Sequence, residues 1–425
     1  AITALFSGPA AGVVGAIRQA GRSGRGELIT FDMGGTSTDV SLVQGGEPAL
    51  AAETEVDGLP VRTPVLDIVS VGAGGGSLVW MDEGGMLRVG PRSAGAEPGP
   101  ACYGKGGTEP TVTDAHVVRG TIRPESFLGG AMALDADAAH RAFEGVAAKL
   151  GTDVRGAAAA AIRLAVANIV RAIQLVSTER GRDPRDYALV PFGGAGPLLA
   201  AEIAEELGVR EILVPPNPGV ISAQGLLAAD TLKVRGVTRR MPLDAAAPAA
   251  LRAAHAEMQA AAEAEFRSLG LDGALEFALE ADMRFLGQAF EIPVPIEAAA
   301  LPGLTEAALA ERFIAAHRRV YLHGGEPGRR AEIVSLRFTA RRRLAALPRV
   351  RERAAAVTRP PEAPVRLADG STVAARLVDA AALAPGDSIA GPAMIEGYSS
   401  STWVPPGWSA RRDDAGNTLL TRSDA

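Results

Sequence analysis

The sequence is poor in cysteine, histidine and lysine, and each shortage excludes a class of chemistry. Its one cysteine, Cys102, excludes an intramolecular disulfide and any multi-cysteine metal cluster. The 5 histidines leave little material for a histidine-rich metal site. Only Lys105, Lys149 and Lys233 are lysines, and the formal net charge is −6, so the chain lacks the basic surplus typical of nucleic-acid binding. We therefore expect no nucleic-acid partner.

Long apolar runs and a leader segment are also missing. No stretch approaches the roughly 18 consecutive apolar residues of a membrane-spanning helix, so we expect no membrane partner. The chain begins Ala1-Ile2-Thr3, with neither the basic nor the apolar region of a signal peptide, which favours a cytoplasmic protein. A dense series of motifs follows almost at once. We therefore expect the natural N-terminus to lie upstream, although loss of the initiator methionine alone would give the same start.

Apolar residues and glycine are what the sequence contains in quantity. With 425 residues, 47% of them apolar, the chain is long enough for two or three domains and too apolar to be disordered. Much of the glycine (50 residues in all) lies in the first third of the chain, which predicts loops there. Strand, glycine loop and helix follow one another in the order typical of an α/β layer.

Apolar periodicity predicts the elements and a division into two domains. An α/β domain is predicted over residues 1–240, and an α+β domain with a β-rich end over 241–425. The Ala- and Pro-rich segment 240–250 is the predicted linker. The predicted strands lie at 28–31, 40–43, 188–191, 211–214, within 275–295 and at 332–339. The predicted helices lie at 10–20, on either side of Gly151 between 134 and 181, and at 198–207, 249–269 and 305–321.

The most informative motif is Asp32-Met33-Gly34-Gly35-Thr36-Ser37-Thr38-Asp39, between two predicted strands. Backbone N–H groups approach a phosphate closely only where side chains are small, and the hydroxyls of Thr36, Ser37 and Thr38 add donors. Asp32 and Asp39 cannot bind phosphate, but they can hold Mg²⁺ or orient a water molecule. This composition is typical of the phosphate hairpin of actin-like ATPases. A plain Gly-Gly hairpin turn is the alternative.

Two further glycine loops could approach a ligand. The first, Val71–Ser77, follows an apolar strand, and its Gly74 and Gly75 are expected contacts, although such loops also serve packing. The second, Phe192–Pro197, opens a predicted helix, whose free N–H groups attract anions. Its glycines lack the spacing of a dinucleotide fold. In an actin-like fold they would face the nucleoside; they are Gly193, Gly194 and Gly196.

Three other features are weaker. The segment Gly99–Gly106 is similar to a P-loop, but it has glycine where Ser or Thr is required, so we reject it. Cys102 would need a base such as His116 to act as a nucleophile, and a packing role is favoured. Thr111–Ala115 places a carboxylate beside hydroxyls, which predicts either part of a nucleotide site or a cap for the following segment.

Taken in order, the motifs resemble the hydantoinase A/5-oxoprolinase family. The matching segments cover nearly the whole chain: Ser7–Gly12, Phe31–Val40, Gly72–Ser77, Gly90–Gly104, Pro110–Ala115, Phe192–Pro197, Val214–Pro216 and Gly391–Glu396. The resemblance implies an actin-like (ribonuclease H-like) ATPase half followed by the family's α+β C-terminal domain. It also implies that the family's N-terminal domain, which carries a first hairpin, is missing, so we expect this chain alone to hydrolyse ATP poorly.

The resemblance further implies ATP-dependent opening of a cyclic amide, in which phosphorylation of the amide oxygen creates a leaving group. The implied cofactors are ATP and Mg²⁺, the substrate is a small cyclic amide, and the partner is a B-type hydantoinase/oxoprolinase subunit. By the match, Gly34–Thr38 would hold phosphate. Asp32 and Asp39 would serve Mg²⁺ or water as the catalytic residues.

Two departures from the family leave alternatives open. Val69 and Leu199 stand where many members have histidine, so this chain cannot use those positions in the same way. The alternatives are an ATP-dependent ketone carboxylase subunit, another actin-like phosphotransferase, and a non-catalytic scaffold that binds its partner but not nucleotide.

Overall fold

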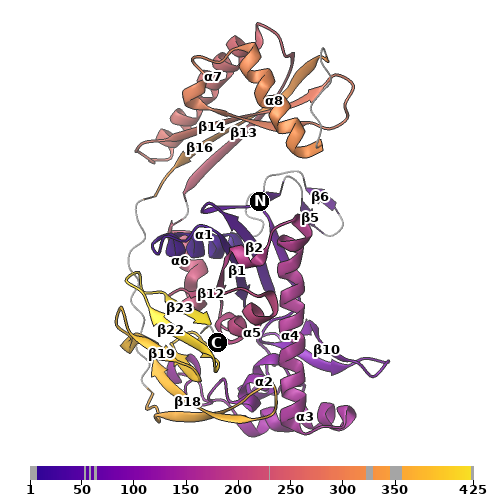
Figure 1. The fold of residues 1–425 in the computed structure, drawn as a ribbon, viewed down its shortest axis with the longest axis vertical. Helices are drawn as coiled ribbons and strands as arrows, with labels where there is room; N and C mark the ends of the chain where they lie inside the picture. Colours follow the sequence, from indigo (N-terminus) through magenta and orange to yellow (C-terminus); the bar gives the residue numbers. More distant parts are fainter. Residues whose placement is uncertain are drawn as a thin grey trace. The chain divides into compact units, whose positions relative to one another are not determined.

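The chain forms two compact units, which a computed structural model describes for residues 7–51, 54–56, 59–61, 65–228, 230–321, 329–344 and 357–422. Unit 1 combines Ala1–Ala228 with Leu347–Ala425, and unit 2 comprises Ala229–Ala346. Each unit is described on its own, and Figure 1 gives the labels of their helices and strands.

Unit 1 is built on a nine-stranded sheet whose centre is nearly all buried. Its five central strands, in spatial order, are β8 (Ile68–Val71), β2 (Thr38–Gln44), β1 (Leu28–Met33), β11 (Ala188–Phe192) and β12 (Glu211–Val214). Strand β2 is antiparallel to both of its neighbours, β8 and β1, whereas β1, β11 and β12 are parallel. Burial on both faces explains why β1 and β11 are almost continuously apolar in sequence.

Helices cover both faces of this sheet. On one face, α4 and α5 pack against Ile29, Phe31 and Leu189. On the other face, α1 and α6 pack against Val190 and Phe192. The helices of unit 1 are α1 (Ser7–Gly21), α2 (Val112–Arg119), α3 (Ala136–Leu150), α4 (Val154–Val176), α5 (Gly196–Leu207) and α6 (Ile221–Ala228). Asp135 caps α3, and Gly151 ends it.

One helix corrects the expectation about long apolar segments. Within the described part of the chain, Val154–Arg180 is long and apolar enough to cross a membrane by length and composition. Its apolar face lies in the core of unit 1, where residues such as Ile162, Ile169 and Ile173 are buried. A core helix passes the same test of length and composition, and α4 packs as one.

The C-terminal strands extend the main sheet of unit 1. Strand β23 (Thr418–Arg422) pairs with β12, β22 (Trp408–Arg412) pairs with β23, and β19 (Ser388–Ala390) pairs with β22. Four more strands form a second sheet: β17 (Glu362–Arg366), β18 (Thr372–Asp379), β20 (Ala393–Glu396) and β21 (Ser401–Val404). The compact units therefore differ from the predicted division into 1–240 and 241–425. Strand pairing between segments about 200 residues apart decides the difference.

Unit 2 is a four-stranded antiparallel sheet with two helices. Its strands, in spatial order, are β13 (Thr231–Pro242), β16 (Ala331–Arg342), β14 (Glu276–Phe285) and β15 (Ile292–Glu297), and its helices are α7 (Ala247–Ser268) and α8 (Glu306–Tyr321). Their apolar faces form a core of their own. The predicted linker at 240–250 is wrong. Proline there opens the first turn of α7, a position that needs no N–H donor.

The remaining strands of unit 1 are short. They are β3 (Glu47–Pro48), β4 (Leu50–Ala51), β5 (Thr54–Val56), β6 (Leu59–Val61), β7 (Val65–Leu66), β9 (Ser77–Met81) and β10 (Leu87–Ser93). Of these, β9 and β10 form a hairpin that follows the first glycine loop.

Candidate functional site

The predicted hairpin is present, and its turn is open. Asp32 and Asp39 lie directly opposite each other on β1 and β2, so their side chains share one face. The Gly34 N–H donates to the Ser37 carbonyl at 3.1 Å, which closes the turn. A Cβ atom added at Gly35 would meet nothing within 4 Å. The turn backbone is therefore accessible to a ligand from this side.

The first glycine loop packs directly on that turn. The Gly75 N–H donates to the Gly34 carbonyl at 2.9 Å, and the Gly76 N–H donates to the Gly35 carbonyl at 2.6 Å. A Cβ atom at Gly74 would lie 2.7 Å from backbone atoms of Gly35 and Thr36, so only glycine fits. The buried Thr38 hydroxyl donates to the Ala73 carbonyl. This contact also ties the loop to the hairpin, and it engages the Thr38 hydroxyl within the protein.

The second glycine loop approaches the hairpin through its own backbone. Gly193 has a φ of +78°, and a Cβ atom there would lie 2.5 Å from Oδ1 of Asp32 and 2.4 Å from the Met33 carbonyl oxygen. The Ala195 N–H donates to the same carbonyl at 3.1 Å. Helix α5 then begins at Gly196. The structure thus brings together all three glycine segments singled out in the sequence, which lie far apart along the chain.

The two carboxylates of the hairpin have unusual electrostatics. Burial and the charge of Asp39 raise the pKa of Asp32 to about 6. The Ser222 hydroxyl donates a hydrogen bond to the Asp32 carboxylate at 3.4 Å, which partly opposes this rise in pKa. Burial also raises the pKa of Asp39, and a hydrogen bond from Ser70 opposes this. Within the described residues, no group of three or more metal-ligating side chains exists. Two carboxylates beside a phosphate suit Mg²⁺, which keeps several of its waters.

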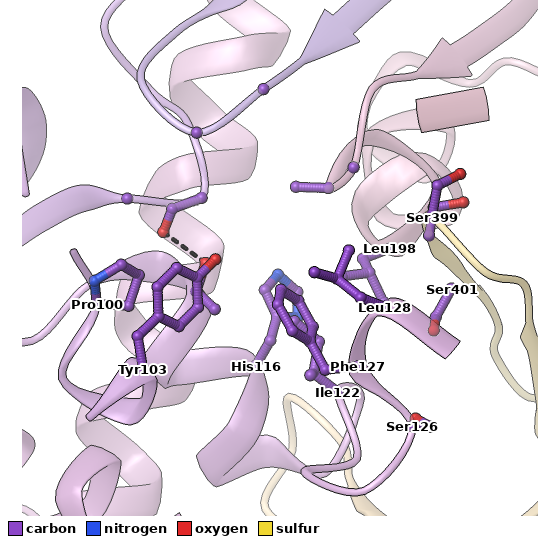
Figure 2. Close-up of a pocket in the computed structure, with 18 of the residues that line it drawn as sticks. Pro100, Tyr103, His116, Ile122, Ser126, Phe127, Leu128, Leu198, Ser399 and Ser401 are labelled. Carbon is purple, nitrogen blue, oxygen red and sulfur yellow. Dashed lines mark hydrogen bonds between the residues drawn. The ribbon is translucent and has the colours of Figure 1, made fainter. Parts of the chain in front are cut away.

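A cavity of about 200 Å³ adjoins the turn, and its two ends differ in chemistry. One end is formed by the backbone of the three glycine segments, at Gly34, Gly35, Gly75, Gly76 and Gly194. The other end is apolar and includes Tyr103, Ile122, Phe127, Leu128 and Leu198. Figure 2 shows these side chains grouped below the glycine turns, with Ser399 and Ser401 at one side.

The cavity has a serine-rich wall, Gly397–Ser401, which was not predicted from the sequence. It joins β20 to β21, and an ion cluster anchors its start. Arg123 donates to both carboxylate oxygens of Glu396 at 2.7 and 3.1 Å, and Arg359 donates to Glu396 at 2.8 Å. Burial alone would raise the pKa of Glu396, but the two guanidinium groups hold it below its usual range. The only local sequence signal was the Ser399-Ser400-Ser401 tripeptide.

The Thr111–Ala115 segment is a helix cap. Thr111 and Asp114 form a capping box at the start of α2. The Asp114 carboxylate also accepts from the Cys102 N–H at 2.8 Å. Burial, together with the Asp114 charge, raises the pKa of the Cys102 thiol far above its usual range, so this cysteine is not activated as a nucleophile. Thr113 lines the cavity and donates to the Gly75 carbonyl at 2.9 Å.

The other positions noted in the sequence lie in the core. Val69 is half-buried on β8 opposite Val40, and Leu199 is fully buried in α5. Both side chains pack in the main apolar cluster of unit 1. His116 is also buried, but it lines the cavity, and burial together with Arg119 lowers its pKa to about 3. From the sequence, His116 was considered only as a base for Cys102.

Fold and site together define an α/β protein in which a carboxylate-bearing glycine hairpin forms one wall of a small cavity. Models of the hydantoinase/oxoprolinase family match residues 1–235, and models of its C-terminal domain match residues 242–421. The chain belongs to the hydantoinase/oxoprolinase family. The resemblance expected from the motifs is thereby confirmed.

Three relatives show the breadth of this family. The caprolactamase subunit alpha of Pseudomonas jessenii is 34% identical over 432 residues, which cover 99% of this chain and 62% of the relative. 5-Oxoprolinase 1 of Arabidopsis thaliana is 40% identical over 248 residues, which cover 54% of this chain and 19% of the relative. A nucleotide-free structure of acetone carboxylase, from work on ATP-dependent acetone carboxylation, has a TM-score of 0.79 at 26% identity and covers 98% of this chain and 61% of that one.

The structure of the ATP-dependent caprolactamase from Pseudomonas jessenii matches equally well. Its TM-score is 0.79 at 33% identity, and the match covers 98% of this chain and 62% of that one. The chain thus has a hydantoinase-type two-domain α/β fold. Two curated relatives match nearly all of this chain, and the chain spans about three fifths of the length of each.

Proposed function

We propose that this chain is the nucleotide-handling part of an ATP-dependent enzyme that opens a small cyclic amide. The observation that carries the proposal is the open hairpin turn with Asp32 and Asp39 at its base, next to a cavity. We further propose that unit 1 is one half of an actin-like (ribonuclease H-like) ATPase. The strand order β8-β2-β1-β11-β12, in which only β2 runs opposite to the other four strands, supports that assignment.

Each part of the site has a proposed task. The backbone of Gly34 and Gly35 and the hydroxyls of Thr36 and Ser37 bind phosphate, because the turn is exposed and free of bulky side chains. Thr38 braces the turn from behind. Gly74 and Gly75 bring the first glycine loop against it. Gly193, Gly194 and Gly196 place the second loop where a nucleoside would lie.

The carboxylates complete the proposed site. Asp32 and Asp39 hold Mg²⁺, and a cation there would offset the burial and mutual repulsion that raise their pKa values. ATP, when bound, supplies the phosphoryl group that turns the amide oxygen into a leaving group. As an alternative to binding Mg²⁺, Asp32 would orient a water molecule.

A partner subunit and a cytoplasmic location belong to the same proposal. The caprolactamase relative is named as a subunit alpha, and this chain spans only part of that subunit. We propose that the present protein likewise works with a B-type hydantoinase/oxoprolinase subunit.

The test is substrate-stimulated ATP hydrolysis by the full-length protein with its partner subunit. Cyclic amides are expected to stimulate hydrolysis, and Asp32→Asn is expected to lower the stimulated rate by about 100-fold or more, because the metal-binding charge is lost. Asp282→Asn in unit 2 is the matched control, since Asp282 is bonded to Ser335 and Arg337 and does not line the cavity. Equal rates in the wild type and Asp32→Asn would contradict the proposal.

A ketone carboxylase subunit is the second candidate, which the match to acetone carboxylase supports. The same assay distinguishes the two candidates by their products. A cyclic-amide hydrolase yields the ring-opened amino acid, whereas a carboxylase fixes bicarbonate onto a ketone. A phosphotransferase would leave a phosphorylated product with its ring intact. A scaffold would show no Mg·ATP binding in equilibrium titrations.

A further inference from the structure

Unit 1 has a second cavity, which shares no residue with the cavity beside the glycine hairpin. It is a groove of about 680 Å³. Its two long walls are the neighbouring helices α4 and α5 (Figure 1), and the turn after β17 and the end of β21 complete the lining. All of these elements belong to unit 1, so the groove is formed within one compact unit.

The groove exposes one face of α4. The accessible lining residues of this helix recur every three or four positions, which places them on one side of it. They are Ala159, Arg163, Ala167, Val170, Arg171 and Gln174. From the first to the last of them, the stripe extends about 22 Å along the helix. In an 18-residue apolar window of Val154–Arg180, only 44% is buried. A helix that is apolar on most sides is normally covered, so this stripe is an unfilled contact surface.

The two helices that form the groove carry opposite charges. Over its whole length α4 has arginines but no Asp or Glu, whereas α5 has glutamates but no Arg or Lys. The charged residues of these helices that line the groove are Arg163 and Arg171 on α4 and Glu202, Glu205 and Glu206 on α5. Glu179, which follows α4, lines it as well. The groove thus has a cationic wall and an anionic wall on either side of apolar surface.

These charges are not used up within the protein. Among the described residues, neither Arg163 nor Arg171 has a hydrogen-bond or ion-pair partner, and Glu206 has none either. Glu202 and Glu205 bind other residues of unit 1 rather than the arginines of α4. Both walls therefore present charge to an occupant of the groove, and complementary charge on that occupant would fix its orientation.

An amphipathic α-helix of about four turns matches the length and the chemistry of this surface. Its apolar stripe would contact the accessible alanine and valine residues of α4. A small ligand would cover only part of the 22 Å stripe. An anionic membrane surface would be repelled by the glutamates of α5. A second copy of the chain that presented the same face would set one concave surface against another and leave the groove unfilled.

We propose that this groove binds an amphipathic helix of a partner subunit, with acidic side chains toward Arg163 and Arg171 and basic side chains toward Glu206. The existence of a partner subunit rests on the proposed function. The inference adds the surface that the partner contacts and the charge pattern of the contacting helix. Since the groove shares no residue with the proposed ATP site, assembly can be measured without turnover.

The test measures the Kd between the full-length protein and its B-type subunit by sedimentation velocity or isothermal titration. The double variant Arg163→Glu/Arg171→Glu is expected to raise Kd by about tenfold or more, because acidic side chains of the bound helix then face like charge. Arg155→Glu is the matched control. It makes the same charge change at an exposed position of the same helix, but Arg155 does not line the groove, so Kd is expected to be unchanged.

Two further variants probe the same groove without reversing its charge. Ala167→Trp fills the groove and is expected to raise Kd as well, because Ala167 is exposed at the middle of the stripe. Benzoylphenylalanine in place of Ala167 is expected to photo-crosslink to a helical segment of the B-type subunit that carries acidic residues. Thermal unfolding of each variant shows that it is folded.

The outcomes are distinct from those that test the proposed function. An unchanged Kd in both Arg163→Glu/Arg171→Glu and Ala167→Trp overturns the inference. A crosslink only to the same chain, to a second copy or to lipid overturns it too, since another occupant then fills the groove. If the two subunits assemble but no cyclic amide stimulates ATP hydrolysis, the proposed function fails while the Kd values still decide the inference.

Discussion

The two units of the chain use partly or fully buried carboxylates in opposite ways. In unit 1, Asp32 and Asp39 have hydroxyl partners, and neither has an ion-pair partner among the described residues. Burial and, for Asp32, repulsion from Asp39 raise their pKa values. In unit 2, Glu332 is bonded to Arg240 and Arg284, and its pKa is lowered.

The difference distinguishes a candidate site from a structural ion cluster. A buried carboxylate without a cation is retained at a cost in stability, and such groups are concentrated at functional sites. A carboxylate with two guanidinium partners is satisfied within the protein. Glu396 shows that unit 1 also contains the second kind, because it binds Arg123 and Arg359 and anchors the serine-rich wall of the cavity.

The largest expected effect comes from breaking the ion cluster in unit 1. Glu396→Ala leaves Arg123 and Arg359 buried without their shared partner, and it is expected to lower the free energy of unfolding by about 3–5 kcal/mol. Glu332→Ala in unit 2 is expected to cost less, because the Arg240 side chain is 65% exposed and can be hydrated. Urea denaturation measures both variants. A larger loss for Glu332→Ala would reverse this ranking.

The next prediction concerns pH. Because its pKa is raised from 3.8 to about 6, ionised Asp32 destabilises the fold; the cost is absent below about pH 4, grows up to pH 6 and then stays constant. Asp32→Asn is therefore expected to match the wild type near pH 4 and to exceed it by about 3 kcal/mol at pH 7. Urea denaturation between pH 4 and pH 8 checks this.

Glu332 is the control for this pH profile, because the sign of its shift is opposite. Its pKa is lowered, first by the hydrogen bonds from Arg240 and Arg284, so its stabilisation is present at neutral pH and is lost as pH falls below 4.5. Glu332→Gln is expected to be less stable than the wild type at pH 7 and to converge with it in acid. A difference between wild type and Asp32→Asn that is independent of pH would refute the raised pKa of Asp32.

The smallest expected effect concerns backbone packing. Gly74→Ala places a Cβ atom 2.7 Å from the backbone of the hairpin turn, and it is expected to cost about 1–3 kcal/mol of stability. It should also lower phosphate binding, because the turn must move. Gly236→Ala in β13 is the matched control. Its Cβ atom would meet nothing within 4 Å, and removing a glycine restricts the unfolded chain, so a neutral or slightly stabilising effect is expected.

Much of the fold was predictable because local rules determined it. Alternating and helical apolar patterns located β1, β2, β11 and the helices α3 and α4, and Gly151 marked the end of α3. The Gly-Gly turn between two apolar strands located the hairpin. These features depend on neighbours within a few residues, and the sequence displays them directly.

The site was predictable only in part. Asp32, Asp39 and the glycine segments were identified from composition, and the structure places them together; their assigned roles remain predictions. His116 was considered only as a base for Cys102, and the serine-rich wall was not predicted, because neither has a local pattern that differs from a core histidine or a surface loop. Their importance arises from a shared cavity, which unites residues from positions 34 to 401.

By itself, the sequence determined the family, the hairpin and the identity of the residues that can approach a phosphate, since close backbone approach requires glycine wherever it occurs. The tertiary structure alone decided which strands close the main sheet, because β12 and β23 pair across about 200 residues. It also decided the chemistry of the site. Burial leaves Asp32 without a cation and leaves Nε2 of His116 without a partner, and burial is a property of the folded chain.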